Sequence, residues 1–228
     1  MAFRRKAHAI LAHKPDILVI PECEHPDKLI FKDDIIKPSN TLWFGKNRNK
    51  GLAILSFSDL TFKVLDNYNV NLRMIIPIQV TGEGVDFNLF AVWAYNPDDK
   101  DGRYIEQVHK AIIHYEDLLS NKPTILIGDF NSNSIWDKKH RSSNHSNVVK
   151  LLEEKGIFSM YHLYKKQAQG KELHPTYYMY RHLDRPYHID YCFASANFVS
   201  RLKSVEIGDF GYWKNYSDHT PLIVEFNN

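Results

Sequence analysis

Apolar runs of strand length recur through this chain, and several of them adjoin an acidic motif. Because strand ends are where loops gather and backbone burial stops, polar side chains delivered there can meet in one place. Four motifs follow this arrangement: Glu22 after residues 16–21, Gly128-Asp129-Phe130-Asn131 after residues 124–127, His188-Ile189-Asp190-Tyr191 leading into residues 192–194, and Ser217-Asp218-His219 just before residues 221–226.

Each motif alone has an ordinary explanation. Gly-Asp-x-Asn is common turn chemistry, since Asp and Asn bond their own backbone after a strand. Glu22 alone fits a solvated strand end, and Asp218 and His219 alone fit a solvated loop. Four strand-associated motifs in one chain are far less expected by accident than any one of them, so the set predicts a functional site.

Helical and strand patterns alternate along the chain without a linker or a repeat. Residues 105, 108, 112, 115 and 119 are apolar at helical spacing. We predict helices over residues 2–13, 103–119 and 146–155, and strands near residues 16–21, 41–45, 51–57, 60–65, 72–80, 86–95, 124–128, 175–180, 188–194, 203–208 and 220–226. This mixture favours two packed sheets with helices outside.

Length and charge are consistent with one enzyme domain over residues 1–228. The 29 basic and 27 acidic residues leave a net charge of +2, which gives no global basic field for nucleic acid. The two cysteines, Cys23 and Cys192, do not indicate a disulfide framework. There is no leader-like or membrane-spanning run, so we expect a soluble, cytoplasmic monomer that does not bind membranes.

The acidic motifs match what metal-assisted attack on phosphate requires. A hard cation such as Mg²⁺, or Mn²⁺, prefers carboxylate oxygen and keeps several waters for substrate and nucleophile. Glu22 is the candidate ligand. The attacking water must also be oriented or deprotonated, and the charge on the phosphate must be stabilised. The side chains available for these functions are Asp129, Asn131, Asp190, Asp218 and His219.

With these motifs the chain resembles the endonuclease/exonuclease/phosphatase superfamily, which includes deoxyribonuclease I-like nucleases, abasic-site endonucleases, inositol-polyphosphate phosphatases and neutral sphingomyelinases. The Gly-Asp-x-Asn motif and the terminal Ser-Asp-His carry the resemblance, which extends from the first helix to the last strand. It implies an α/β (α+β) fold: a four-layer α/β/β/α sandwich of two mixed sheets flanked by helices, with the site at one end of the sheet pair.

The resemblance also implies residue roles. Glu22 looks like the metal-binding glutamate and Asp218 like a second carboxylate near the metal. Asp129 looks like the residue that positions or deprotonates the water, and Asn131 like the asparagine that bonds the phosphate and holds Asp129. His219 looks like the imidazole that contacts phosphoryl oxygens, paired with Asp190. Tyr95, in Ala94-Tyr95-Asn96-Pro97, either faces the phosphate or packs at a strand end.

A carboxylate bonded to one imidazole nitrogen fixes the tautomer and raises the pKa of the ring. We therefore expect removal of Asp190 to disable His219. His188 alternates with Asp190 and is expected on the same strand face, either supporting the site or simply ending the strand. The twelve histidines do not indicate zinc, because neither His-Glu-x-x-His nor Cys-x-x-Cys occurs.

One departure from the family pattern is expected to matter. Members usually begin with a strand that ends in Trp-Asn, whose asparagine lies beside the metal. This sequence begins at Met1-Ala2-Phe3 and continues directly into the first expected helix. We expect a start placed too late rather than a genuine loss, because the missing strand would be central in its sheet.

The sequence leaves the substrate open among three readings. Basic loops favour a nuclease acting on DNA or RNA; they contain Lys46, Arg48, Lys50, Lys138, Lys139, His140, Arg141, Lys165, Lys166 and Lys171. A phosphatase or phosphodiesterase of small molecules or lipid head groups is the second reading, although the Trp-Cys-Asp-Arg signature of the inositol phosphatases is absent. The third is a binding protein that has lost turnover. The aromatic stretch at residues 176–181 could stack on bases or pack a sheet.

Overall fold

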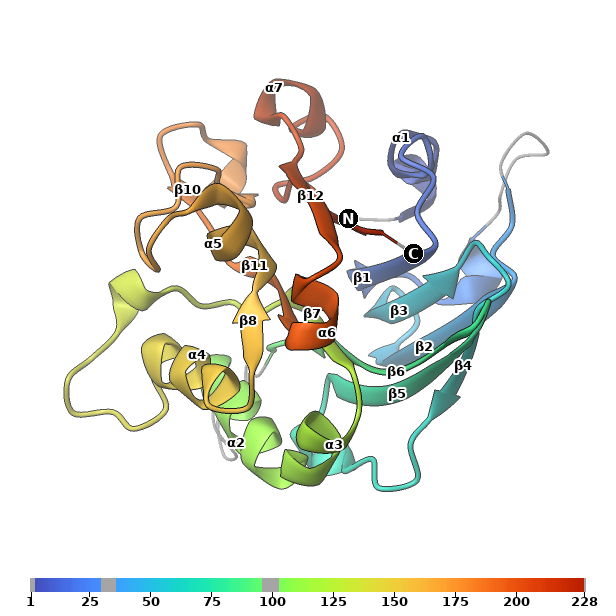
Figure 1. Ribbon diagram of the computed structural model, residues 1–228. Helices are drawn as coiled ribbons and strands as arrows, with labels where there is room; N and C mark the ends of the chain where they lie inside the picture. The colour runs from blue at the N-terminus through green and yellow to red at the C-terminus, as the bar shows by residue number, and fades with distance from the viewer. Residues whose placement is uncertain (1–2, 30–35, 96–102, 228) are drawn as a thin grey trace.

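The computed structural model describes residues 3–29, 36–95 and 103–227 (Figure 1). Its strands are β1 (Ile17–Cys23), β2 (Asn40–Asn47), β3 (Lys50–Ser56), β4 (Thr61–Val64), β5 (Ile75–Gly82), β6 (Val85–Trp93), β7 (Thr124–Asp129), β8 (Ile157–Ser159), β9 (Tyr177–Tyr178), β10 (Pro186–Tyr187), β11 (Asp190–Ser195), β12 (Leu202–Ile207) and β13 (Leu222–Phe226). Its α-helices are α1 (Ala7–Leu11), α2 (Ile105–His114), α3 (Glu116–Asn121), α4 (His145–Glu153), α5 (Met160–Lys165), α6 (Ala196–Val199) and α7 (Phe210–Trp213). Short 3-10 turns cover Phe3–Arg5, Pro26–Lys28, Val70–Leu72, Ser134–Trp136 and Met179–Arg181.

The larger sheet has six strands in the order β4-β5-β6-β7-β11-β8. Neighbouring strands are antiparallel except β6 and β7, which run parallel and are connected through α2 and α3. A parallel pair needs such a crossover because a tight hairpin can only join antiparallel strands. This sheet holds two of the acidic motifs at the ends of β7 and β11.

The second strand layer is divided into two parts. One part has the order β1-β3-β2, and the other pairs β12 with β13. A cavity of about 190 Å³ is lined by residues 17–22 of β1 and by Pro221 and Leu222 at the start of β13. Residues 127–129 and Asp190 and Tyr191 of the larger sheet also line it. Among the described residues, β1 pairs only with β3 and β13 only with β12, so each has one unpaired edge.

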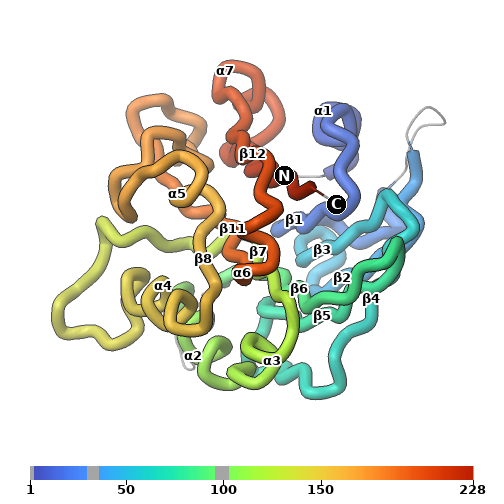
Figure 2. The backbone as a smooth tube through the Cα atoms, viewed as in Figure 1, coloured from blue at the N-terminus to red at the C-terminus, as the bar shows by residue number. Residues whose placement is uncertain are grey.

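Three apolar clusters hold the layers together. One lies between the helices and the larger sheet and includes Val108, Ile112 and Leu126, consistent with α2, α3 and α4 gathering on one side of the tube in Figure 2. Another fills the space between the strand layers, and the last packs α1 against β1 and β3. Cys23 and Cys192 are buried free thiols whose pKa burial raises to about 12, so both act as small apolar groups.

This architecture confirms the predicted sandwich of two main sheets flanked by helices, but several boundaries were wrong. The helix expected over residues 103–119 is two helices, because the backbone at Tyr115 is not helical. The first helix is a 3-10 turn followed by five residues of α1. The strand expected over residues 175–180 keeps only β9, since a left-handed Tyr180 turns the chain. Among the described residues, no helix has the length and apolar character needed to cross a membrane.

Candidate active site

Asp129 is the last residue of β7 and follows a glycine that the strand requires. Gly128 has φ +141°, and a Cβ atom built there would lie 1.9 Å from the carbonyl oxygen of Val92 on the neighbouring strand. Only glycine accepts this combination of backbone angle and close approach. Asp129 is buried at the strand end, with 4% of its surface exposed.

Asp190 lies directly opposite Asp129. The two are register partners on the antiparallel strands β11 and β7, an arrangement that brings side chains of neighbouring strands close together. Burial raises the pKa of Asp129 to about 8, and the nearby Asp190 charge adds to the rise. Two carboxylates in one low-dielectric place disfavour double ionisation, so this site holds a proton readily at Asp129.

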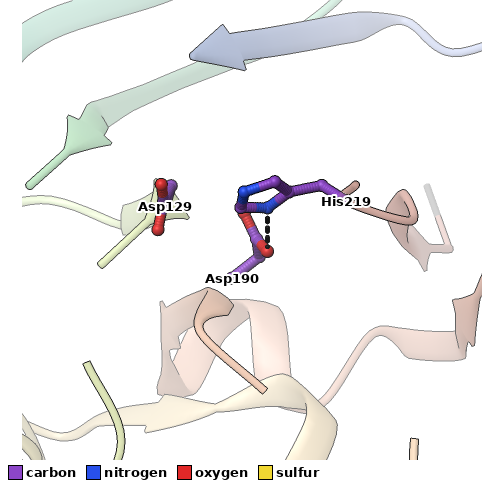
Figure 3. A group of neighbouring side chains, drawn as sticks. All are labelled: Asp129, Asp190 and His219. Carbon is purple, nitrogen blue, oxygen red and sulfur yellow. Dashed lines mark hydrogen bonds and ion pairs between the residues drawn. The ribbon is translucent and has the colours of Figure 1, made fainter. Parts of the chain in front are cut away.

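His219 completes the group from the loop before β13. Its Nδ1 donates to Oδ2 of Asp190 at 2.8 Å, and the ring edge points toward Asp129 (Figure 3). Burial alone would lower the pKa of His219, but the Asp190 charge and hydrogen bond outweigh it and raise the pKa to about 9. The imidazole is therefore cationic at neutral pH.

Asn131 braces Asp129. Its backbone N–H donates to Oδ1 of Asp129 and its side-chain Nδ2 donates to Oδ2, both at 2.8 Å. The same Nδ2 donates to the carbonyl of Ala94 at 3.1 Å. The amide group thus has both of its donors engaged, and the left-handed backbone of Asn131, at φ +46°, permits this compact turn.

Thr176 joins three segments of the site, and its role was not predicted from the sequence. Its hydroxyl accepts from the backbone N–H groups of Ile189 and Asp190 at 3.1 and 3.0 Å. Its carbonyl accepts from Thr220 N–H at 2.8 Å, next to His219. Thr176 therefore sets the relative positions of Asp190 and His219. Pro175-Thr176 carries no local pattern that distinguishes it from an ordinary turn, so only the tertiary contacts reveal it.

Glu22 is the next-to-last residue of β1 and lies in an irregular part of that strand. The β1–β3 register shifts between Ile20 and Cys23, and Glu22 has φ +60°, which turns its side chain toward the cavity it lines. Lys50 at the start of β3 forms an ion pair with it, with Nζ 2.8 Å from Oε1. The sequence predicts Lys50 to be one of the basic loop residues, whereas in the structure the pairing of β3 with β1 brings it to Glu22.

Asp218 lines the same cavity as Glu22, Asp129, Asp190 and His219. Its carbonyl accepts from Tyr178 N–H at 2.7 Å, so the Ser217-Asp218-His219 segment is fixed to β9. Lys6 also lines the cavity. Burial lowers the pKa of Lys6, while Asp218 and other nearby groups act in the opposite direction.

Tyr95 lies at the edge of this group. Its ring stacks on Trp93 with centroids 4.6 Å apart, and Nζ of Lys50 lies 5.7 Å from its centroid. Tyr95 thus reaches the Glu22–Lys50 pair but is not among the residues that line the cavity. Asn96 and Pro97 of its motif lie outside the described residues.

His188 does not join the group around Asp190. Its ring packs on Tyr161 at 4.3 Å and its Nδ1 donates to the carbonyl of His174 at 2.8 Å. The carbonyl of His188 accepts from Asn133 Nδ2 and from the hydroxyl of Tyr191, both at 2.9 Å. β11 begins only at Asp190, so the strand alternation that was expected to put His188 and Asp190 on one face does not extend to His188.

Comparisons with known proteins identify the family and the fold. A family model described as the Endonuclease/Exonuclease/phosphatase family matches residues 6–219. Among solved structures, a 3′-5′ exonuclease from Neisseria meningitidis has a TM-score of 0.69 at 19% identity, covering 99% of this chain and 94% of that one. An AP endonuclease from Archaeoglobus fulgidus is also similar in fold, with a TM-score of 0.65 at 18% identity, covering 100% of this chain and 96% of that one.

A 3′ phosphatase from Neisseria bound to a product DNA hairpin is similar at 20% identity, with a TM-score of 0.66 and coverage of 99% of this chain and 94% of that one. No curated protein matches the sequence. The structural likenesses show the fold, and the family match covers most of the chain, including the first candidate carboxylate and the last candidate histidine. The chain therefore belongs to the endonuclease/exonuclease/phosphatase family.

Proposed function

We propose that this protein is a divalent-metal-dependent phosphodiesterase that hydrolyses DNA or RNA. The main observation behind the proposal is that Asp129, Asp190 and His219 converge. One carboxylate oxygen or imidazole nitrogen of each lies within 4.8 Å of the others. Glu22 and Asp218 line the same cavity. The family match supports cleavage of a phosphate ester. The metal, the nucleic acid and the residue roles are parts of the proposal.

Asp129 is the proposed base for the attacking water. Its pKa of about 8 lies near the working pH, where a general base is most effective. The water oxygen forms the new bond to phosphorus, its proton passes to Asp129, and the ester oxygen departs and is reprotonated from solvent. The two bonds from Asn131 keep the carboxylate in a single orientation for this transfer.

His219 is the proposed electrostatic partner of the phosphate. Its pKa of about 9 keeps the ring cationic, and with Nδ1 held by Asp190 the Nε2–H is free to donate to a phosphoryl oxygen. A fixed cation in a site with little water stabilises the negative charge that develops in the transition state. Asp190 acts through His219 by fixing its orientation.

Glu22 and Asp218 are the residues proposed to hold Mg²⁺ or Mn²⁺. Their carboxylates suit a hard cation, and the ion pair between Glu22 and Lys50 shows that this position already accommodates a positive charge. By contrast, the oxygens of Asp129 accept from Asn131, and Asp190 accepts from His219. A bound cation would supply charge neutralisation at the phosphate and the leaving oxygen.

A nucleic acid substrate is supported by the chain's surface and by its relatives. Lys138, Lys139 and Arg141 are exposed on the loop that follows the Asp129 motif. Exposed cations of this kind contact phosphates along a nucleic acid strand. One structural neighbour is bound to a DNA hairpin, and others are named as an exonuclease and an AP endonuclease.

A terminal phosphate monoester is the second candidate substrate, because the neighbour bound to DNA is described as a 3′ phosphatase. The test is to incubate the protein and its Asp129→Asn variant with Mg²⁺ or Mn²⁺ and four substrates: a supercoiled plasmid, single-stranded RNA, a 3′-phosphorylated DNA oligonucleotide and a small phosphodiester. Cleavage of a nucleic acid by the parent, lost in the variant, supports the proposal. Turnover of the small diester alone, or of none, would overturn the nuclease assignment.

A further inference from the structure

A continuous row of aromatic rings leads from His219 to the surface. The ring of Tyr177 contacts the imidazole of His219 with centroids 4.7 Å apart. Tyr187 lies next to Tyr177, nearly parallel, at 6.4 Å, and Trp136 contacts Tyr187 at 5.0 Å. We call Tyr177, Tyr187 and Trp136 the aromatic row. Its inner end lies in the candidate active site and its outer end is in solvent.

Trp136, at the outer end of the aromatic row, is unusually exposed to solvent for a tryptophan. Trp136 is 46% exposed, whereas Trp93 and Trp213 are 3% and 4% exposed. Ile135 beside it is 56% exposed. Leaving an indole in water forfeits about 25 cal/mol for every Å² of apolar surface not buried, so packing alone does not account for its position. Tyr178, next to Tyr177 in sequence, has the opposite environment, because it is buried and stacks on Phe210 at 4.0 Å.

Positive charge flanks the aromatic row. Lys138, Lys139 and Arg141 follow Trp136 on one loop, and Arg185 precedes Tyr187 in the β9–β10 hairpin; all four are exposed. A polyanion held by these cations would pass its phosphates beside the row and into the cavity. The combination of cations along a strand and aromatic faces between them is the general design of sites for single-stranded nucleic acid.

From this arrangement we infer that the aromatic row is a stacking platform for unpaired nucleobases next to the phosphate to be cleaved. The inference rests on the proposed nuclease function and makes it more specific. Bases inside a duplex are stacked on each other and cannot offer their faces to Trp136 or Tyr187, so the preferred substrate is single-stranded or frayed nucleic acid. The faces of all bases can stack, and the row therefore recognises strand state rather than sequence.

The test measures the binding of nucleic acid by a variant that is expected not to cleave it. In the Asp129→Asn background, fluorescence anisotropy of a labelled single-stranded oligonucleotide and of the same sequence as a blunt duplex gives both affinities. We expect tighter binding of the single strand, weakened about tenfold or more by Trp136→Leu and by Tyr187→Leu. Trp136→Phe should retain most of the affinity because it keeps an aromatic face. Tyr212→Leu removes an equally exposed ring, 49% exposed on α7, and should change nothing.

Equal affinity of Trp136→Leu, Tyr187→Leu and Tyr212→Leu for the single strand would overturn the inference, as would equal parent affinity for single strand and duplex. Circular dichroism of each variant separates loss of contact from loss of fold, and Tyr187→Leu decides the matter if Trp136→Leu fails to fold. The two proposals fail in different ways. If the parent protein cleaves nucleic acid but the Trp136 and Tyr187 variants bind it equally well, only the stacking role of the aromatic row is disproved. If binding depends on these aromatic residues but the parent protein does not cleave nucleic acid, only the nuclease activity is disproved.

Discussion

The imidazole of His219 and the carboxylate of Asp190 form a single unit, joined at 2.8 Å between Nδ1 and Oδ2 although they lie 29 residues apart in sequence. Asp190→Asn and His219→Ala should each lower the phosphodiesterase rate about 100-fold or more. The double change should cost little more than either single change, because both remove the same function.

The control for this cycle is the exposed His182–Asp184 pair, whose atoms lie 3.9 Å apart. Its corresponding single and double changes should leave the rate within about twofold, since exposed ion pairs contribute little. If the rate loss of the double variant equalled the product of the two single losses at Asp190 and His219, the two residues would act independently.

Substitutions at Glu22 and Lys50 are expected to change the affinity for metal in opposite directions. Glu22→Gln should weaken Mg²⁺ or Mn²⁺ binding about tenfold from the micromolar to millimolar range expected for such sites, without unfolding the protein. Lys50→Met should strengthen it a few-fold, because it removes the ammonium group that now pairs with Glu22. Isothermal calorimetry measures both, with Lys46→Met on the same hairpin as the matched control. Unchanged affinity in Glu22→Gln would remove Glu22 from the metal site.

Thr176→Val keeps the side-chain shape and removes the hydroxyl that accepts from Ile189 and Asp190 N–H. Leaving these donors without their partner should cost about 1–3 kcal/mol of unfolding free energy. At about 2–4 °C for each kcal/mol in a protein of this size, calorimetry should detect the loss. Activity should fall more than in the control Thr61→Val, whose hydroxyl bonds an exposed neighbour. A fully active, equally stable Thr176→Val would show that Asp190 is positioned without it.

Stability without metal should decrease as pH rises. The pKa values of Asp129 and His219 in the folded protein, about 8 and about 9, both exceed their ordinary values of 3.8 and 6.5. Folding therefore favours the protonated form of each group, and the stabilisation is lost as pH rises through these values. In EDTA, the melting temperature should fall most steeply between pH 6.5 and 8, where both groups keep a proton in the folded protein that they lose in the unfolded chain. Asp190→Asn should flatten this dependence, and a melting temperature that rises over the range would contradict the assignment.

The last prediction concerns the unpaired edges of β1 and β13 in the divided strand layer. In the part of the chain that the structure describes, β1 and β13 each have one unpaired edge beside the cavity. Backbone amides of residues 17–20 and 222–225 should therefore exchange with solvent earlier than those of β6 and β7, which are paired on both edges. Hydrogen exchange measures this, and equal protection of the two sets of amides would disprove the prediction.

Much of the architecture was accessible from local sequence patterns. Alternating strand and helix periodicities indicate the layers, and acidic motifs at strand ends indicate which residues meet, because strand termini at one edge of a sheet bring their loops together. Asp129 and Asp190 could be identified in this way, and the register of β7 and β11 then places them opposite each other. The break at Tyr115 and the turn at Tyr180 could not, since apolar periodicity continues through both.

Only the tertiary structure reveals contacts between segments that are distant in sequence. Thr176 reaches Asp190, Lys50 reaches Glu22, and Trp136 reaches Tyr187, and no local pattern encodes any of these pairs. The same holds for the pKa of His219, which depends on the balance between burial and the charge of Asp190. The amino-acid sequence specifies which chemical groups are present and which strands deliver them. Packing decided which partners they meet, because hydrogen bonding and charge act over a few ångströms in space regardless of separation along the chain.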